Sequence, residues 1–223
     1  LKGLDPVNCG SNPGEFLLNS GRLRDQWHTM TRTGRVPALM QHQSEPFIAI
    51  HPSDARLFQL LDGDLVELSN RQGLFRGRAQ VTDAQRCGEL FVPMHWSGQF
   101  STTSCCDVLF DESRDPISRQ PAFKQGRVQL QKMPVTAELV LLSRQADLLS
   151  RFQPLCGYGV LIPHAHMFEY RLALTVPVSE LSQQFRLISQ QLTAALRQSH
   201  HALELQQLEA HGSQHWRQAF VNA

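Results

Sequence analysis

The chain has 223 residues and 41% hydrophobic content, enough to bury one sizeable core or one core with a smaller appendage. Lysine and arginine total 21 against 20 aspartates and glutamates, so no global positive charge is present to attract nucleic acid or an anionic membrane. Any anion site must therefore be local. No apolar run approaches the roughly 20 residues that cross a bilayer, and no export signal precedes residue 15, which predicts a cytoplasmic protein.

Five cysteines, at positions 9, 87, 105, 106 and 156, form neither a CxxC pair nor an even framework. This pattern disfavours zinc, iron–sulfur and disulfide-stapled folds, and it predicts reduced thiols. The adjacent Cys105 and Cys106 have two alternatives to free thiols, metal ligation and a strained vicinal bridge, but cytosolic thiols usually stay free. Because the chain begins at Leu1 rather than at methionine, we interpret it as a piece of a longer protein.

The first half of the chain is rich in short predicted strands. Residues 1–15 carry the glycine, proline, asparagine and serine of a linker, and residues 16–21 (FLLNSG) predict a buried strand that turns sharply at Gly21. Residues 47–83 predict a strand, a short helix capped by Ser53, and two further strands, with turns at 62–64 and 71–73. Two more strands are expected, at GELFVPMHW (88–96) and at 127–131. This close spacing indicates a closed or nearly closed β-barrel.

The pattern changes after Pro134. AELVLLSR (137–144) and FEYRLALT (168–175) predict two further strands around a loop that contains Tyr158, Pro163, His164 and His166. Residues 179–210 place apolar side chains three or four positions apart, as one long amphipathic helix or two shorter ones would. We therefore predict four segments: a linker (1–15), a barrel domain (16–134), a β extension (135–177) and a helical tail (178–223).

The segment NSGRLRDQWHTMTRTG (19–34) contains most of the side chains that could bind a ligand. It gathers arginines and Ser/Thr hydroxyls around a single acid, Asp25, inside a loop bounded by glycines. Guanidinium groups and hydroxyls suit a phosphate or diphosphate, and Gly21 would let backbone N–H groups approach its oxygens. Trp27 and His28 add flat rings that could stack on a heterocycle. The alternative is a solvated basic loop whose tryptophan packs inward.

This loop resembles the signature of assimilatory nitrate reductases of the dimethyl sulfoxide reductase family. The resemblance continues, in that family's order, through EPFIAIHPSDA (45–55), GDLVELSNRQG (63–73), RCGELFVPMHW (86–96) and DPISRQPAFKQGRVQL (115–130). A more diffuse likeness extends to about residue 175. Five collinear matches are far more specific than any single motif.

The resemblance implies a mainly β fold, a double-psi β-barrel with a small α/β extension and a C-terminal helical tail. It also implies a molybdopterin guanine dinucleotide, one of two that surround a single molybdenum (bis-MGD), and the reduction of nitrate to nitrite. Carried over position by position, the cofactor-binding residues would be Ser20, Gly21, Arg22, Gln26, Trp27, His28, Thr29, Thr31, His95, Trp96, Asp107, Gln120 and Lys124. Ser20 replaces a common threonine and keeps its hydroxyl, whereas Asp107 stands where relatives often carry asparagine and can only accept hydrogen bonds.

No catalytic nucleophile or acid–base pair is evident in this chain. The cysteine that ligates molybdenum and an iron–sulfur cluster would precede Leu1, so we expect the isolated chain to be inactive. Its implied partners are the rest of the polypeptide, nitrate and an electron-donor protein. Three alternatives stay open: another molybdopterin oxidoreductase such as a formate dehydrogenase, a non-enzymatic anion- or nucleotide-binding module, and a protein-interaction role for the tail.

The remaining histidines favour structural roles. His42 and His51 stand beside strand or helix starts, where surface or capping roles are the commoner ones. His164 and His166 have the spacing of a weak metal pair but lack a third ligand nearby. We expect the adjacent histidines at 200 and 201 to face water.

Overall fold

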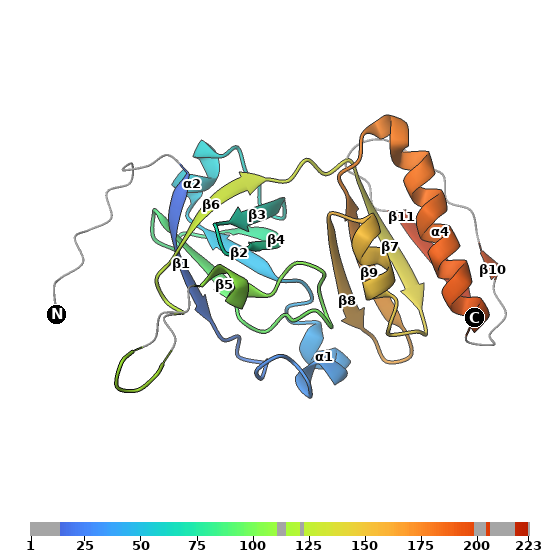
Figure 1. Cartoon of the computed structure of the whole chain (residues 1–223), viewed down its shortest axis with the longest axis horizontal. Coiled ribbons are helices and arrows are strands. Elements are labelled where there is room, and N and C mark those ends of the chain that lie inside the picture. Colours follow the sequence, from blue (N-terminus) through green and yellow to red (C-terminus); the bar gives the residue numbers. More distant parts are fainter. Residues whose placement is uncertain (1–13, 111–114, 121–122, 199–203, 206–216, 223) are drawn as a thin grey trace. The chain divides into compact units, whose positions relative to one another are not determined.

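The computed structural model describes residues 14–110, 115–120, 123–198, 204–205 and 217–222 (Figure 1). The chain divides into two compact units. The first combines the residues up to Arg24 with Glu45–Trp96 and Ser104–Met133, and the second combines Asp25–Ser44, Ser97–Thr103 and the residues from Pro134 onward.

The first unit is a closed barrel of six strands (Figure 1). These are β1 (Glu15–Gly21), β2 (Phe47–Ile50), β3 (Leu65–Ser69), β4 (Leu74–Val81), β5 (Glu89–Pro93) and β6 (Gly126–Lys132), in the order β1-β5-β2-β4-β3-β6. The pairs β1–β5 and β2–β4 are parallel and therefore require crossover connections. Exchanging β1, β2 and β3 with β4, β5 and β6 leaves this cyclic order unchanged, which is the internal symmetry of a double-psi barrel.

The barrel closes around apolar side chains that alternate along its strands. In β1 and β4 every second residue is buried, whereas all four residues of β2 are buried. Leu18, Val66, Phe75 and Leu90 are completely inaccessible to solvent and belong to one continuous core. The strands predicted at 16–21, 47–50 and 127–131, and the turns at 62–64 and 71–73, are confirmed, as is the mainly β fold class.

The first unit also contains two short helical segments between its strands. Helix α2 (Pro52–Leu57) follows β2, and a 3-10 turn, η2 (Cys106–Leu109), precedes β6. The predicted cap of α2 at Ser53 is wrong, because His51 occupies the N-cap position and its Nδ1 accepts the Ser53 backbone N–H at 3.1 Å. Pro52 takes the first helical position, where its missing N–H costs nothing. The capping role expected of His51 is thereby confirmed.

The second unit is built on a five-stranded sheet with the order β10-β11-β7-β9-β8. Its strands are β7 (Ala137–Ser143), β8 (Tyr158–Pro163), β9 (Phe168–Leu174), β10 (Glu204–Leu205) and β11 (Arg217–Asn222). Helix α4 (Leu181–Gln198) packs Ile188, Leu192 and Ala195 into a core shared with this sheet and with α3 (Leu149–Phe152). The expected C-terminal helix is confirmed by α4.

Other short elements of the second unit are η1 (Thr33–Arg35), α1 (Pro37–Met40), η3 (Gln153–Leu155) and η4 (Val178–Glu180). Helix α1 packs on β8, and Ser101 forms a β-bridge with Val160. The compact units therefore differ from the predicted contiguous segments, because residues 25–44 and 97–103 contact the C-terminal sheet.

Two secondary-structure predictions for the C-terminal half are wrong. The loop predicted to contain Tyr158 and Pro163 is in part strand β8, whose six residues are all buried between neighbours. In the described part of the tail, α4 ends at Gln198, and residues 204–205 and 217–222 are strands rather than the predicted helix. Strand β11 pairs in parallel with β7 and hydrogen-bonds the edge that β7 would otherwise expose.

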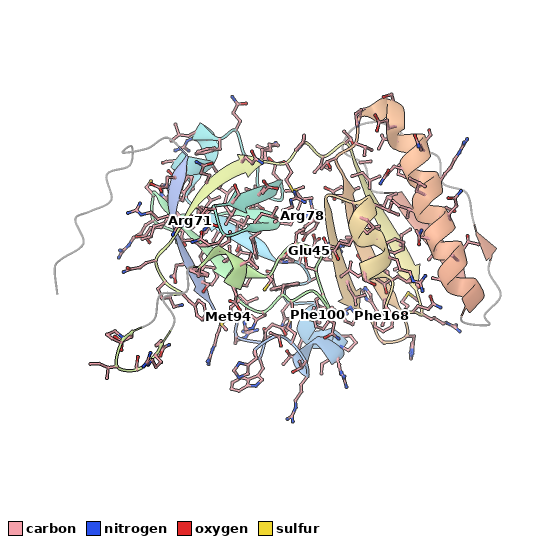
Figure 2. All side chains as sticks on the ribbon, in the orientation of Figure 1. Glu45, Arg71, Arg78, Met94, Phe100 and Phe168 are labelled. Carbon is pink, nitrogen blue, oxygen red and sulfur yellow. The ribbon has the colours of Figure 1, made fainter. Side chains whose placement is uncertain are left out.

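The start of β2 is fixed to β4 by polar contacts. Glu45, which is buried, accepts a hydrogen bond at 3.0 Å from the Arg78 guanidinium, and both side chains are labelled in Figure 2. The Pro46 carbonyl accepts the Arg78 backbone N–H at 3.0 Å. Gly77 lies against this junction, since a Cβ added there would stand 2.9 Å from the Pro46 carbonyl oxygen. The backbone at this point leaves no room for a side chain.

We expect Gly77→Ala to lower the free energy of unfolding by about 2 kcal/mol, because overpacking against backbone forces a local shift. Gly98→Ala is the matched control, because a Cβ at Gly98 meets nothing within 4 Å. It should change stability by less than about 0.5 kcal/mol. Urea denaturation of both variants measures the difference, and equal effects would contradict the packing described here.

Candidate functional site

The parallel pairing of β1 and β5 brings two chain exits to one end of the barrel. Gly21, the last residue of β1, is in register with Pro93, the last residue of β5. The Met94 backbone N–H donates to the Gly21 carbonyl at 2.9 Å, and Met94 marks this end of the barrel in Figure 2. Residues 22–24 and 94–96 therefore leave the barrel side by side. We refer to this region, with Ser20, Gly21 and Lys124, as the β1–β5 end.

Lys124 and Phe123 join the β1–β5 end from a distant part of the sequence. The Ser20 hydroxyl donates to the Phe123 carbonyl at 3.0 Å, and the Ser20 backbone N–H donates to the same oxygen at 3.3 Å. The Lys124 ammonium donates in turn to the Ser20 carbonyl. The segment that precedes β6 is thus tied to the end of β1 by three hydrogen bonds.

The β1–β5 end carries a local positive charge. Lys124 and Arg22 are exposed, and so is Arg24, two residues further along the chain. An ammonium group has three donors, and that of Lys124 uses one of them on the Ser20 carbonyl without an ion pair to any residue the structure describes. These cations give the end of the barrel the chemistry of an anion site, although the chain as a whole has a net charge of only +1.

The absence of a side chain at Gly21 makes room for the ring of Phe91. A Cβ added at this position would stand 2.6 Å from Cε2 of Phe91, a residue of β5 whose ring also lies 6.0 Å from that of Phe47. The sequence had indicated that Gly21 lets a ligand approach the backbone. The contact with Phe91 gives the residue a further, structural reason to be glycine.

His95 holds the Arg22–Arg24 segment in place. Its side chain is completely buried, and its Nε2 accepts the Leu23 backbone N–H at 2.8 Å. Nε2 must therefore be the unprotonated ring nitrogen. Because the bonded amide lies between the two arginines, His95 orients both of them through the backbone.

Trp96, the residue after His95, is also buried. It is 1% exposed, and its indole Nε1–H has no hydrogen-bond partner in the part of the chain that the structure describes. A buried donor without a partner costs roughly 1–3 kcal/mol, so such groups call for an explanation, such as an acceptor supplied by a ligand or water.

The loop that follows Arg24 belongs to the second unit. Gln26 is buried there and donates from Nε2 to the Leu39 carbonyl at 3.5 Å and to Met40 Sδ at 3.4 Å. Its Oε1 has no partner among the described residues. This amide therefore presents one unsatisfied acceptor, as Trp96 in the other unit presents one unsatisfied donor.

Trp27 and His28 are both exposed, and their rings meet edge to face with centroids 4.5 Å apart. His28 has a φ of 47° and Met30 a φ of 61°, both in the left-handed region that side chains disfavour. Thr29 and Thr31 are exposed beside them. The loop thus holds an exposed aromatic pair on a strained backbone, a combination that occurs often at functional sites.

Among the described residues, no hydrogen bond joins Asp107 or Gln120 to the β1–β5 end. Asp107 is exposed in η2 and accepts from the Cys106 thiol at 3.5 Å, where burial raises the pKa of that thiol well above its usual range. The exposed Gln120 side chain hydrogen-bonds to no described residue. Its carbonyl closes a turn with Asp115, and the backbone N–H of Ser118 lowers the pKa of the Asp115 carboxyl. Sequence reasoning missed Phe123, since a backbone acceptor leaves no mark in the sequence except its place beside Lys124.

Two other histidines, His42 and His164, pair with acids. His42 Nδ1 lies 2.8 Å from Asp25, and His164 Nε2 lies 2.8 Å from Glu169. No group of three or more histidine, cysteine, aspartate or glutamate side chains suited to a metal ion occurs among the residues that the structure describes. The histidines at 200 and 201 lie outside the described residues.

Residues 16–127 match the molydopterin dinucleotide binding domain, so the chain belongs to this protein family. A nitrate reductase of Klebsiella oxytoca is 45% identical over 130 residues, which cover 58% of this chain and 15% of that protein. The alpha subunit of an F420-dependent formate dehydrogenase of Methanocaldococcus jannaschii is 30% identical over 118 residues, 53% of this chain and 17% of that protein.

A periplasmic nitrate reductase of Desulfovibrio desulfuricans is 34% identical over 109 residues, 49% of this chain and 14% of that protein. The chain thus spans about a sixth of the length of these three relatives. None of the described helices is both long and apolar enough to pass through a membrane.

We expect His95→Leu to release the Leu23 amide, since leucine offers no acceptor. Hydrogen exchange at Leu23 should become at least about tenfold faster, in line with a lost bond of roughly 1–3 kcal/mol at a buried group. His95→Gln is the matched variant, because its amide oxygen can still accept. Slow exchange in His95→Leu would show that His95 does not hold this segment.

Proposed function

We propose that this chain is the part of a molybdenum-dependent nitrate reductase that binds a molybdopterin guanine dinucleotide. The β1–β5 end would receive the diphosphate of the dinucleotide. One observation carries the proposal: the Lys124 ammonium is fixed on the Ser20 carbonyl, next in the chain to Gly21 and Arg22. A basic residue more than 100 positions away is thereby brought to the start of the arginine-rich loop.

The residues at this end fit an anionic cofactor. Lys124 would contribute a point charge, and Arg22 a planar fork that can bind two phosphate oxygens at once. The Ser20 hydroxyl proton is engaged by Phe123, so Ser20 would act by placing the Lys124 segment and by offering its oxygen as an acceptor. His95 would orient Arg22 through the Leu23 amide, and Trp96 would donate its unpaired N–H to an oxygen or nitrogen of the cofactor.

The remaining predicted residues keep their roles as predictions from the resemblance. Gln26 has an acceptor to offer, and the rings of Trp27 and His28 are exposed for stacking. Thr29 and Thr31 would supply hydroxyls. Asp107 and Gln120 are exposed and uncommitted to the β1–β5 end, so the proposal does not depend on them.

The bound cofactor would supply the chemistry, a two-electron reduction of nitrate to nitrite at molybdenum. This chain would bind and orient one dinucleotide, and the reaction would need the remainder of a longer polypeptide, with its iron–sulfur cluster, and an electron-donor protein. The isolated chain should therefore be inactive. Nitrate is favoured over formate because the nitrate reductase of Klebsiella oxytoca is 45% identical and the formate dehydrogenase subunit 30% identical.

The assimilatory type and a cytoplasmic location also belong to this proposal, on the resemblance of residues 19–34. Fractionation of the source cells, with nitrate reductase activity followed in each fraction, tests the location. Activity confined to the periplasm, the compartment named for the relative from Desulfovibrio desulfuricans, would contradict it. A non-enzymatic binding module would give no nitrate reduction in any fraction.

Guanosine 5′-diphosphate carries the cofactor's nucleotide and diphosphate, and it should bind this chain. Arg22→Ala and Lys124→Ala should each weaken binding by at least about tenfold, because hydrogen bonds to charged groups contribute roughly 1.5–3 kcal/mol. Arg56→Ala is the matched control, since Arg56 is an exposed arginine on α2. Isothermal titration measures all four proteins, and equal affinities for the three variants and the parent chain would contradict the site.

The longer native polypeptide should contain molybdenum and should reduce nitrate when given an artificial electron donor. The same preparation should not oxidise formate. Metal analysis and the two activity assays decide between the nitrate and formate alternatives. Formate oxidation without nitrate reduction would refute the substrate while leaving the diphosphate site intact.

A further inference from the structure

A cysteine and a histidine meet at the end of the barrel opposite to the proposed cofactor site. His51 directly follows β2, and Cys87 precedes β5 by two residues. Because β2 and β5 are antiparallel, the carboxyl end of β2 lies at the amino end of β5. Gly21 and Pro93 lie at the other end of β5. The pair therefore stands apart from the arginine-rich loop.

The geometry of the pair is that of a thiol and its base. Cys87 Sγ lies 3.0 Å from His51 Nδ1, and the Ser53 backbone N–H donates to the same nitrogen at 3.1 Å. An amide N–H can only donate, so Nδ1 must carry a lone pair. This single lone pair is shared between the Ser53 N–H and the Cys87 thiol, so Nδ1 can take the thiol proton only as the Ser53 N–H releases it.

Contacts on both sides hold the thiol in place. The buried carboxylate of Asp54, on α2, accepts the Gly88 backbone N–H at 2.8 Å. The Gly88 carbonyl accepts the Leu17 backbone N–H at 3.0 Å, and Gly88 has a φ of 76°, which favours glycine. The residue after Cys87 is thus fixed to α2 and to β1. Cys87 itself is half-buried, so a small reagent can reach it.

Two other cysteines, Cys105 and Cys106, lack the histidine base that Cys87 has, among the residues that the structure describes. Cys106 is buried and donates to Asp107, and burial raises the pKa of its thiol, which keeps it protonated and unreactive. Cys105 is half-buried like Cys87, but it makes no hydrogen bond through its thiol to any residue in the described part of the chain. Cys105 therefore serves as an internal comparator with similar exposure and no base.

We propose that Cys87 is a site of thiol–disulfide exchange with low-molecular-weight disulfides such as oxidised glutathione, with His51 as the proton acceptor. Cys87 Sγ would attack one sulfur of the disulfide, forming a new S–S bond as the old one breaks. The thiol proton would pass to His51 Nδ1 as the Ser53 N–H releases that nitrogen, and then to the departing thiolate, after which the Ser53 N–H bonds Nδ1 again. The products are a mixed disulfide on Cys87 and one free thiol, so Cys87 is oxidised and the departing sulfur is reduced.

The first test follows each cysteine of the full chain separately. The protein is incubated with oxidised glutathione at neutral pH, and adducts are quantified over time by peptide mass spectrometry. Cys87 should be modified at least about tenfold faster than Cys105, the minimum expected of a positioned base. Modification of Cys87 at or below the rate of Cys105 would overturn the proposal.

The second test removes the base and keeps the cap. In His51→Asn and His51→Ser, the side-chain oxygen can accept the Ser53 N–H, because asparagine and serine are both favoured N-cap residues. Each variant should slow the modification of Cys87 by about tenfold and leave that of Cys105 unchanged, with urea denaturation to confirm folding. An unchanged Cys87 rate in a folded variant would refute the role of His51. Because Arg22 and Lys124 take no part, this outcome is independent of the guanosine diphosphate titration.

Discussion

The parallel pairing of β1 with β5 is the constraint on which the first unit depends. It sets Gly21 beside Pro93, so that two chain segments leave the barrel together. A parallel pair cannot be closed by a hairpin, and its crossover connection forces sequence-distant residues into one place. The antiparallel pairing of β6 with β1, in which Leu18 is in register with Gly126, then places Lys124 so that its ammonium donates to the Ser20 carbonyl. The symmetric β2–β4 pair completes the closed barrel.

Charge is distributed locally. The chain has almost equal numbers of acids and bases, yet exposed cations gather where β1 ends, and Lys124 contacts a carbonyl there rather than an acid. On β4, by comparison, Arg76 pairs with Glu67 at 2.7 Å and Arg78 with Glu45 at 3.0 Å.

Several residues that the resemblance marked for the cofactor have structural contacts of their own. Ser20 donates its hydroxyl proton to Phe123, Gly21 makes room for Phe91, and His95 accepts the Leu23 amide. Such residues fix the geometry of the segment that carries Arg22 and Arg24. A pattern shared with a family does not separate the side chains that touch a ligand from those that position them, because loss of either would disturb the same site.

Alternating hydrophobicity and turn residues were enough to locate the barrel strands, because every second side chain of β1 and β4 had to face the core. The composition of the arginine-rich loop predicts an anion site, and that site is part of the proposed function. Strand β8 was not predicted, because all six of its residues are buried and hydrophobicity does not alternate along it. Strand β11 was not predicted either, because its partner, β7, lies far away in the sequence. The contacts of Lys124 with Ser20 and of Cys87 with His51 were decided by tertiary structure alone, since 104 and 36 positions separate them and only strand pairing determines which distant residues meet.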